Sequence, residues 1–138
     1  VTDFPDEELL KHDNVIGIPH LGASTPESED NCAIMAATQL KDYLECGNVV
    51  NSVNFPDCEM QFTGNIRIIV INKNIPAMVQ KITGVLADRN INISNMLNRH
   101  QDEYAYNIID IEGDFDEKAI EELEAIDGII KARVIECK

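Results

Sequence analysis

The sequence has no long hydrophobic run and few basic residues. No apolar run approaches the roughly 20 residues that a helix needs to cross a bilayer, and no signal peptide is visible. Only 11 lysines and arginines stand against 25 aspartates and glutamates, which gives a net charge of −14. Charge of that sign repels both nucleic-acid phosphates and anionic lipid. We therefore expect neither a nucleic acid nor a membrane surface as a partner.

The sequence also lacks cysteine pairs of the kind that bind metals. None of its four cysteines forms a C-x-x-C pair or has a histidine at zinc-finger spacing; they are Cys32, Cys46, Cys58 and Cys137. A chain of 138 residues, 44% of them hydrophobic, is long enough to bury a core without a disulfide or a metal. We interpret the cysteines as reduced thiols of a cytoplasmic protein and expect no metal site.

The charge is distributed unevenly along the chain. Residues 1–64 carry 12 acidic and two basic residues, whereas residues 65–138 carry 13 acidic and nine basic ones. Turn-forming residues separate the two segments, and we place a domain boundary at about residue 64. Because the chain begins at Val1, directly in strand-like sequence, we expect it to be a piece of a longer protein.

The first segment predicts a buried parallel strand at residues 15–19, followed by one long helix. Thr25 is a suitable N-cap, Pro26 suits the first turn, and apolar residues then recur at helical spacing. Gly47 should end the helix in a left-handed conformation. Residues 1–24 hold short strands without neighbours, so we do not expect them to form an independent domain.

The second segment alternates strands and helices. We predict strands at residues 66–71, 90–99, 104–112 and 129–136, a helix carrying Met78, Ile82 and Leu86 on one face, and another at residues 116–126. The order βαββαβ is that of the ferredoxin-like unit, an antiparallel sheet with both helices on one face. The other face should be left for a partner, because Ile69, Ile71, Ile93 and Ile109 need more cover than two helices provide. The fold class is therefore α/β (α+β).

Two motifs together resemble a known family. His20-Leu21-Gly22-Ala23-Ser24-Thr25, followed by Glu27, resembles the catalytic-histidine segment of the D-2-hydroxyacid dehydrogenases. Residues 65–138 look like an ACT domain, the small-molecule regulatory module that ends many of those enzymes. The resemblance covers essentially the whole chain, and the two motifs in this order are more specific than either alone. Residues 1–64 would then be an incomplete part of the nucleotide-binding and substrate domains.

The resemblance implies an NAD-dependent oxidation in which His20 is the acid–base residue and Gly22 and Ala23 lie against the cofactor. An imidazole accepts a proton near neutral pH, and the end of a strand before a helix is where α/β active sites form. None of the seven glycines forms G-x-G-x-x-G. The family's catalytic arginine and the carboxylate that orients the histidine precede it in sequence, the latter a little before Val1. We therefore expect a C-terminal fragment that is inactive by itself.

The predicted turn after residue 71 holds the other candidate site. Asparagine amides both donate and accept hydrogen bonds, and helix N-termini favour carboxylates. In serine-regulated relatives an amino acid binds between two ACT subunits. The resemblance implies that Asn72 and Asn74 of one chain and Asn92 of the other bind it in a homodimer. Two alternatives remain open: a stand-alone ACT-type amino-acid-binding and dimerisation module, and a fragment of a dehydrogenase for another 2-hydroxy acid.

Overall fold

The computed structural model describes residues 1–63, 66–113 and 115–136, so the predicted boundary at residue 64 and Cys137 lie outside the described residues. It divides into two compact units, residues 1–38 and 39–138, which are described separately. The elements are η1 (Leu9–Lys11), α1 (Pro26–Cys46), β1 (Ile66–Lys73), α2 (Met78–Asp88), β2 (Asn92–Gln101), β3 (Tyr104–Glu112), α3 (Lys118–Glu124) and β4 (Ile129–Glu136). None of the helices in the described ranges has the length and hydrophobicity needed to cross a membrane.

The first unit contains a single strand-like contact. Thr2 forms one parallel bridge with Gly17, in which the N–H of Thr2 donates to Ile16 and the N–H of Ile18 donates to Thr2, each at 3.0 Å. Ile16 and Ile18 remain 60% and 46% exposed. The predicted buried strand at residues 15–19 is therefore wrong. A parallel strand is buried only between neighbours in a sheet, and this segment has one bridged residue as its neighbour.

The long helix and both of its ends agree with the prediction. The hydroxyl of Thr25 accepts the backbone N–H of Ser28 at 3.2 Å, which satisfies a first-turn donor of α1. Gly47 follows the last helical residue with φ of +73°. A Cβ at Gly47 would lie 2.4 Å from Cδ1 of Ile69, so both the backbone conformation and the packing require glycine there.

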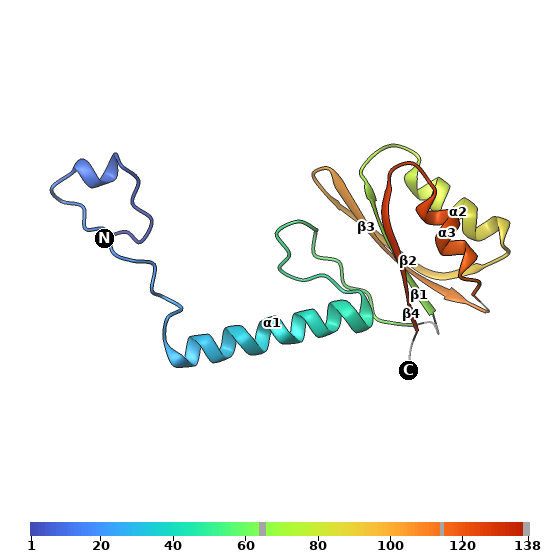
Figure 1. Ribbon diagram of the computed structural model, residues 1–138, viewed down its shortest axis with the longest axis horizontal. Helices are drawn as coiled ribbons and strands as arrows, with labels where there is room; N and C mark the ends of the chain where they lie inside the picture. Colours follow the sequence, from blue (N-terminus) through green and yellow to red (C-terminus); the bar gives the residue numbers. More distant parts are fainter. Residues whose placement is uncertain (64–65, 114, 137–138) are drawn as a thin grey trace. The chain divides into compact units, whose positions relative to one another are not determined.

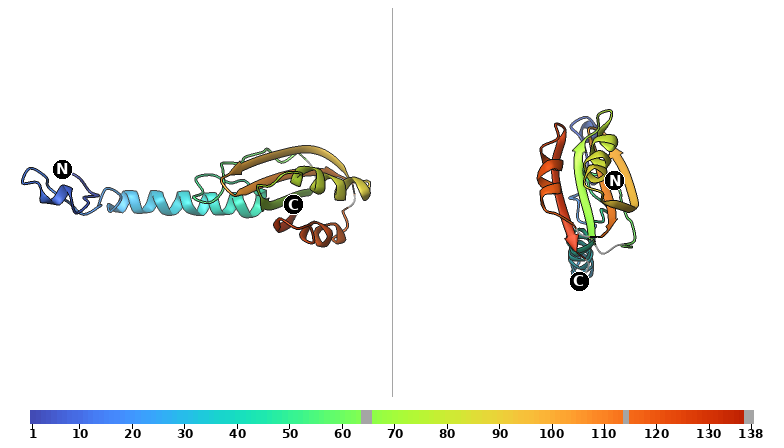
Figure 2. Two further views of the ribbon diagram at one scale, coloured as in Figure 1. Left: turned by 90° about the horizontal axis from the view of Figure 1, so that it is seen from above. Right: turned by 90° about the vertical axis from the view of Figure 1, so that its right-hand side faces the viewer.

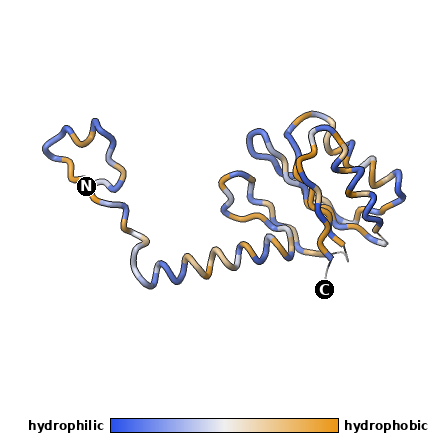
Figure 3. The backbone as a smooth tube through the Cα atoms, in the orientation of Figure 1, coloured by the Kyte–Doolittle hydropathy of each residue, from blue (hydrophilic) through white to orange (hydrophobic). Residues whose placement is uncertain are grey.

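The second unit is built on a four-stranded antiparallel sheet with the order β2-β3-β1-β4 (Figure 1). Helices α2 and α3 cover one face of the sheet (Figure 2), as the ferredoxin-like prediction required. Ile82 and Leu86 of α2 and Leu123 of α3 are fully buried against that face. The strands contain hydrophobic stretches, and these form the sheet's side of the core beneath the two helices (Figure 3).

The other face of the sheet is covered by the chain itself. Residues 47–63, here called the strap, bring Val49, Cys58 and Met60 against Tyr106 and Ile108. Val49 and Cys58 exchange two backbone hydrogen bonds of 2.9 Å, which close the strap into a hairpin-like loop. The expectation that this face is left for a partner is therefore wrong.

Two of the four isoleucines that were expected to need a partner are covered by the chain itself. Ile69 is 1% exposed beneath the strap, and Ile109 is fully buried under the helices. Ile71 and Ile93 are half-buried. The sequence prediction treated residues 47–63 as separate from the sheet and so counted this cover as absent.

Candidate functional site

His20 pairs with a carboxylate of its own unit. Its Nδ1 lies 2.5 Å from Oδ2 of Asp3, and the ring of Phe4 lies against the imidazole with centroids 4.5 Å apart. A carboxylate only accepts, so Nδ1 is the donor, and in the neutral imidazole Nε2 is then the acceptor. The carboxylate that orients the histidine in the resembling family was expected before Val1, and that expectation stays a prediction; within the described residues the carboxylate beside His20 is that of Asp3. Both side chains are about half exposed, at 57% and 44%.

Gly22 and Ala23 lie in an exposed turn next to His20. The N–H of Ser24 donates to the carbonyl of Leu21 at 2.9 Å and closes this turn. A Cβ at Gly22 would meet no atom within 4 Å. Nothing within the described part of the unit therefore requires a glycine there, and a role for Gly22 and Ala23 beside a cofactor stays a prediction.

The loop between β1 and α2 forms a small cavity. Ala77 precedes α2 with φ of +68°, and no side chain caps the helix. A cavity of about 150 Å³ lies at this helix start. Uncharged residues line it: Asn72, Asn74, Ile75, Ala77, Met78, Val79, Gln80, Asn98 and Ala105. Backbone N–H groups of a first helical turn favour a carboxylate, and amide oxygens accept from an ammonium. The cavity is suited to bind a zwitterion, and its lining includes no acid, base or nucleophile.

Asn72 belongs to a chain of three side-chain amides. It is only 2% exposed, and its Nδ2 donates to the carbonyl of Lys73 at 2.7 Å. Its Oδ1 accepts from Nδ2 of Asn107 at 2.7 Å, and Oδ1 of Asn107 in turn accepts from Nδ2 of Asn98 at 2.5 Å. The sequence analysis missed Asn98 and Asn107. The three residues are far apart in sequence and come together only through the registers of β1, β3 and β2.

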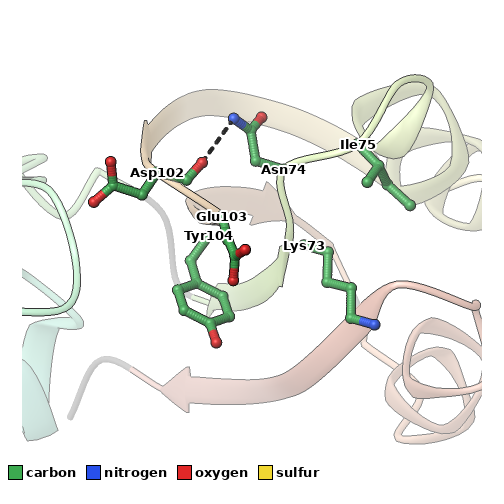
Figure 4. A pocket seen from close by; sticks show the side chains of 6 residues that line it. All are labelled: Lys73, Asn74, Ile75, Asp102, Glu103 and Tyr104. Atoms are coloured by element: carbon green, nitrogen blue, oxygen red, sulfur yellow. Dashed lines mark hydrogen bonds between the residues drawn. The ribbon is translucent and has the colours of Figure 1, made fainter.

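Asn74 joins its loop to the β2–β3 hairpin. Its backbone N–H donates to Glu103 at 2.8 Å, and its Nδ2 donates to the carbonyl of Asp102 at 3.2 Å (Figure 4). Asn74 lines the small cavity and also a second, open one of about 420 Å³. The latter is lined by Lys73, Asn74, Ile75, Asp102, Glu103 and Tyr104 (Figure 4). Asn74 is thus both a candidate ligand-binding residue and a structural link.

Asn92 lies apart from Asn72 and Asn74. It is exposed at the start of the edge strand β2, and its Nδ2 donates to Oε2 of Glu112 at 3.2 Å. It is not among the residues that line either cavity. A single chain thus brings together Asn72 and Asn74 in one cavity. A site that they share with Asn92 of a second chain stays a prediction.

A buried ion pair ties the strap to the sheet. Arg67 and Asp110 are both fully buried and share two hydrogen bonds of 2.6 and 2.9 Å. Nη1 of Arg67 also donates to the carbonyls of Cys46 and Met60 at 2.8 and 2.9 Å. Burial alone raises the pKa of Asp110, but hydrogen bonds from Arg67 and Thr63 outweigh it and hold the pKa below its ordinary value.

A comparison with protein-family models matches residues of the second unit. The family model described as "AHAS small subunit-like ACT domain" matches residues 68–131. The solved ACT domain from the GTP pyrophosphokinase of Chlorobium tepidum is 18% identical, covers 53% of this chain and all of that one, and has a TM-score of 0.44.

Curated relatives match along most of the chain. The D-3-phosphoglycerate dehydrogenase of Escherichia coli (strain K12) is 33% identical over 129 residues, covering 92% of this chain and 32% of the relative. That of Haemophilus influenzae is 31% identical over 128 residues, with coverages of 92% and 31%. The chain spans about a third of the length of these relatives. The curated relatives that match along most of this chain are thus D-3-phosphoglycerate dehydrogenases, and its residues 68–131 match the model of an ACT domain.

Proposed function

We propose that this chain is the regulatory portion of a cytoplasmic, NAD-dependent D-3-phosphoglycerate dehydrogenase of serine biosynthesis. Its ACT domain binds a small amino acid, L-serine, and associates as a homodimer. The observation that carries this proposal is the cavity at the start of α2, which combines uncapped first-turn N–H groups with amide side chains and has no charged group in its lining. The ligand's carboxylate is held by the helix N-terminus and its ammonium by amide oxygens.

The homodimer forms side by side rather than face to face. The strap covers one face of the sheet and the helices cover the other, so neither face is available to a second sheet. The strands at the edges are β2 and β4, and an edge strand carries unpaired backbone groups that a partner strand can satisfy. Pairing through β2 places Asn92 at the boundary between the two chains, as a shared amino-acid site needs.

The catalytic part of the proposal rests on His20. The Asp3–His20 pair holds Nε2 as an acceptor for the hydroxyl proton of a 2-hydroxy acid. Bound NAD would supply the hydride acceptor, and Gly22 and Ala23 would lie beside it. The described residues of the chain supply no G-x-G-x-x-G loop, so the purified 138-residue chain should produce no NADH from 3-phosphoglycerate. NADH production by this chain would refute that part of the proposal.

A titration with L-serine tests the regulatory assignment. Sedimentation of the 138-residue chain should show a dimer at micromolar concentration, and serine at 100 times its Kd should stabilise it by about 2.7 kcal/mol. Because Asn92 donates only to an exposed carboxylate, Asn92→Ala should leave the unliganded Tm unchanged. The same variant should weaken serine binding about tenfold, because it removes one hydrogen bond to a charged group of the ligand.

Asn95→Ala is the matched control. Asn95 lies on the same strand, is exposed, and is not among the residues lining either cavity. It should bind serine like the unmodified chain. A dimer that shows no serine shift would overturn the regulatory assignment and leave an assembly domain. A monomer at micromolar concentration would overturn the dimer.

A further inference from the structure

The amide chain Asn98–Asn107–Asn72 has a fixed direction. Nδ2 of Asn72 must face the carbonyl of Lys73, because two oxygens would repel, so its Oδ1 faces Asn107. Nδ2 of Asn107 donates both to that oxygen and to the carbonyl of Val70 at 2.9 Å. Its own Oδ1 therefore faces Asn98, which has to donate. Two backbone carbonyls thus determine the orientation of all three amides.

The direction decides which atom Asn98 offers to the cavity. Its Nδ2 is used inward, toward Asn107, and Asn98 lines the cavity at the start of α2. Besides the second N–H of Nδ2, Asn98 keeps Oδ1 as an acceptor for a ligand, and no described residue donates to this oxygen. A residue with an available acceptor oxygen in the lining of a cavity at an uncapped helix start complements an α-ammonium beside a carboxylate.

We propose that Asn98 is a ligand-binding residue of this cavity that selects for an ammonium group, and that Asn107 positions it. The inference rests on the proposed amino-acid binding and adds the residue that distinguishes an amino acid from a hydroxy acid. Asn107 is fully buried, so it acts through Asn98 and Asn72 and touches no ligand. Hydrogen bonds to charged groups are roughly twice as strong as neutral ones, so Asn98 favours an ammonium over a hydroxyl.

The test compares L-serine with L-glycerate, which carries a hydroxyl in place of the ammonium. In calorimetric titrations of the 138-residue chain, Asn98→Leu should weaken serine binding about tenfold and reduce the serine-to-glycerate affinity ratio. Asn95→Leu, on the same strand but outside the cavity, should change neither. Asn107→Leu should lower the same ratio, and adding it to Asn98→Leu should lower it no further. A loss of packing alone would weaken both ligands equally.

A second measurement tests the direction of the chain without a ligand. In Asn98→Asp, a neutral carboxyl can still donate to Oδ1 of Asn107. An ionised carboxylate cannot donate, so an acceptor oxygen of the carboxylate would face the acceptor oxygen of Asn107, which is unfavourable. The pKa of the introduced carboxyl is then raised on folding, so its stabilisation is present below the unfolded pKa of about 3.9 and lost as pH rises through the folded one. The stability gap between Asn98→Asp and Asn95→Asp should be wider at pH 7 than near pH 3.5.

The outcomes separate the inference from the proposed function. If the unmodified chain binds no amino acid, the proposed function fails and the ligand contact of Asn98 fails with it. If the unmodified chain binds serine and Asn98→Leu retains the serine-to-glycerate ratio, the inference alone is overturned. A stability gap that does not change with pH would overturn the assigned direction of the amides.

Discussion

Replacing Arg67 tests whether the buried ion pair holds the strap on the sheet. Arg67→Met keeps an apolar stem but removes two hydrogen bonds to Asp110 and two to carbonyls before β1. Asp110 would remain buried with only the two donors of Thr63, each at 3.1 Å. Removing one partner of a buried pair costs about 3–5 kcal/mol, a large share of the 5–15 kcal/mol that stabilises a typical domain.

The chain offers a convenient probe for this measurement. It has no tryptophan and three tyrosines, and all of them, Tyr43, Tyr104 and Tyr106, lie in the second unit. The tyrosine signal in near-ultraviolet circular dichroism during urea unfolding therefore reports on the second unit alone. Arg89→Met is the matched control, since the partners of Arg89 are exposed carboxylates and its loss should be much smaller.

A double variant gives the result that would refute the reasoning. Arg67→Met combined with Asp110→Leu removes both charges, and replacing a whole buried pair with apolar residues is often close to neutral. The double variant should therefore lose clearly less than the sum of the two single losses. Losses that add within about 0.5 kcal/mol would show that the two groups do not act as a pair.

Three further outcomes follow from the same unit. Gly47→Ala should destabilise it by about 1–3 kcal/mol, measured by urea unfolding, because its φ is positive and its Cβ would overlap Ile69. Burial raises the pKa of Cys58 to about 11, so Ellman's reagent should modify the exposed Cys32 first and Cys58 only on unfolding. The lowered pKa of Asp110 contributes stability that is complete above its unfolded pKa of about 4 and is lost as pH falls through the folded value, so the urea midpoint should fall on acidification.

The regular elements could be predicted because their periodicity is local. The long helix begins and ends at the residues that its cap signals indicated, Pro26 and Cys46. The strap could not be predicted in this way, because its buried residues are separated by turns and show no period. One signal for it was present in the sequence of β1, where residues 68–71 are all apolar, and in the structure residues 67–70 are all buried in succession. An unbroken buried run is typical of a strand covered on both faces.

The candidate site was predicted in part for a related reason. Asn72 and Asn74 are neighbours in sequence and share a cavity, which a local pattern can indicate. Asn98 and Asn107 join them only through strand register, because Asn98 lies opposite Asn107 in the β2–β3 pair. A register follows from the whole sheet and from its β-bulges, which no single segment specifies.

The docked strap is held without slack between Gly47 and Thr63. Its 17 residues, 47–63, would reach about 55 Å if fully extended, yet they lie folded on the sheet and are fastened at both ends. Tyr106 donates to the carbonyl of Gly47 at 2.8 Å, and Thr63 donates to Asp110. While these fastenings hold, a shift of β1 or β3 displaces the end of α1 directly instead of being absorbed by loose chain. If these hydrogen bonds break, the same 17 residues become a tether long enough to let the sheet move independently of the end of α1.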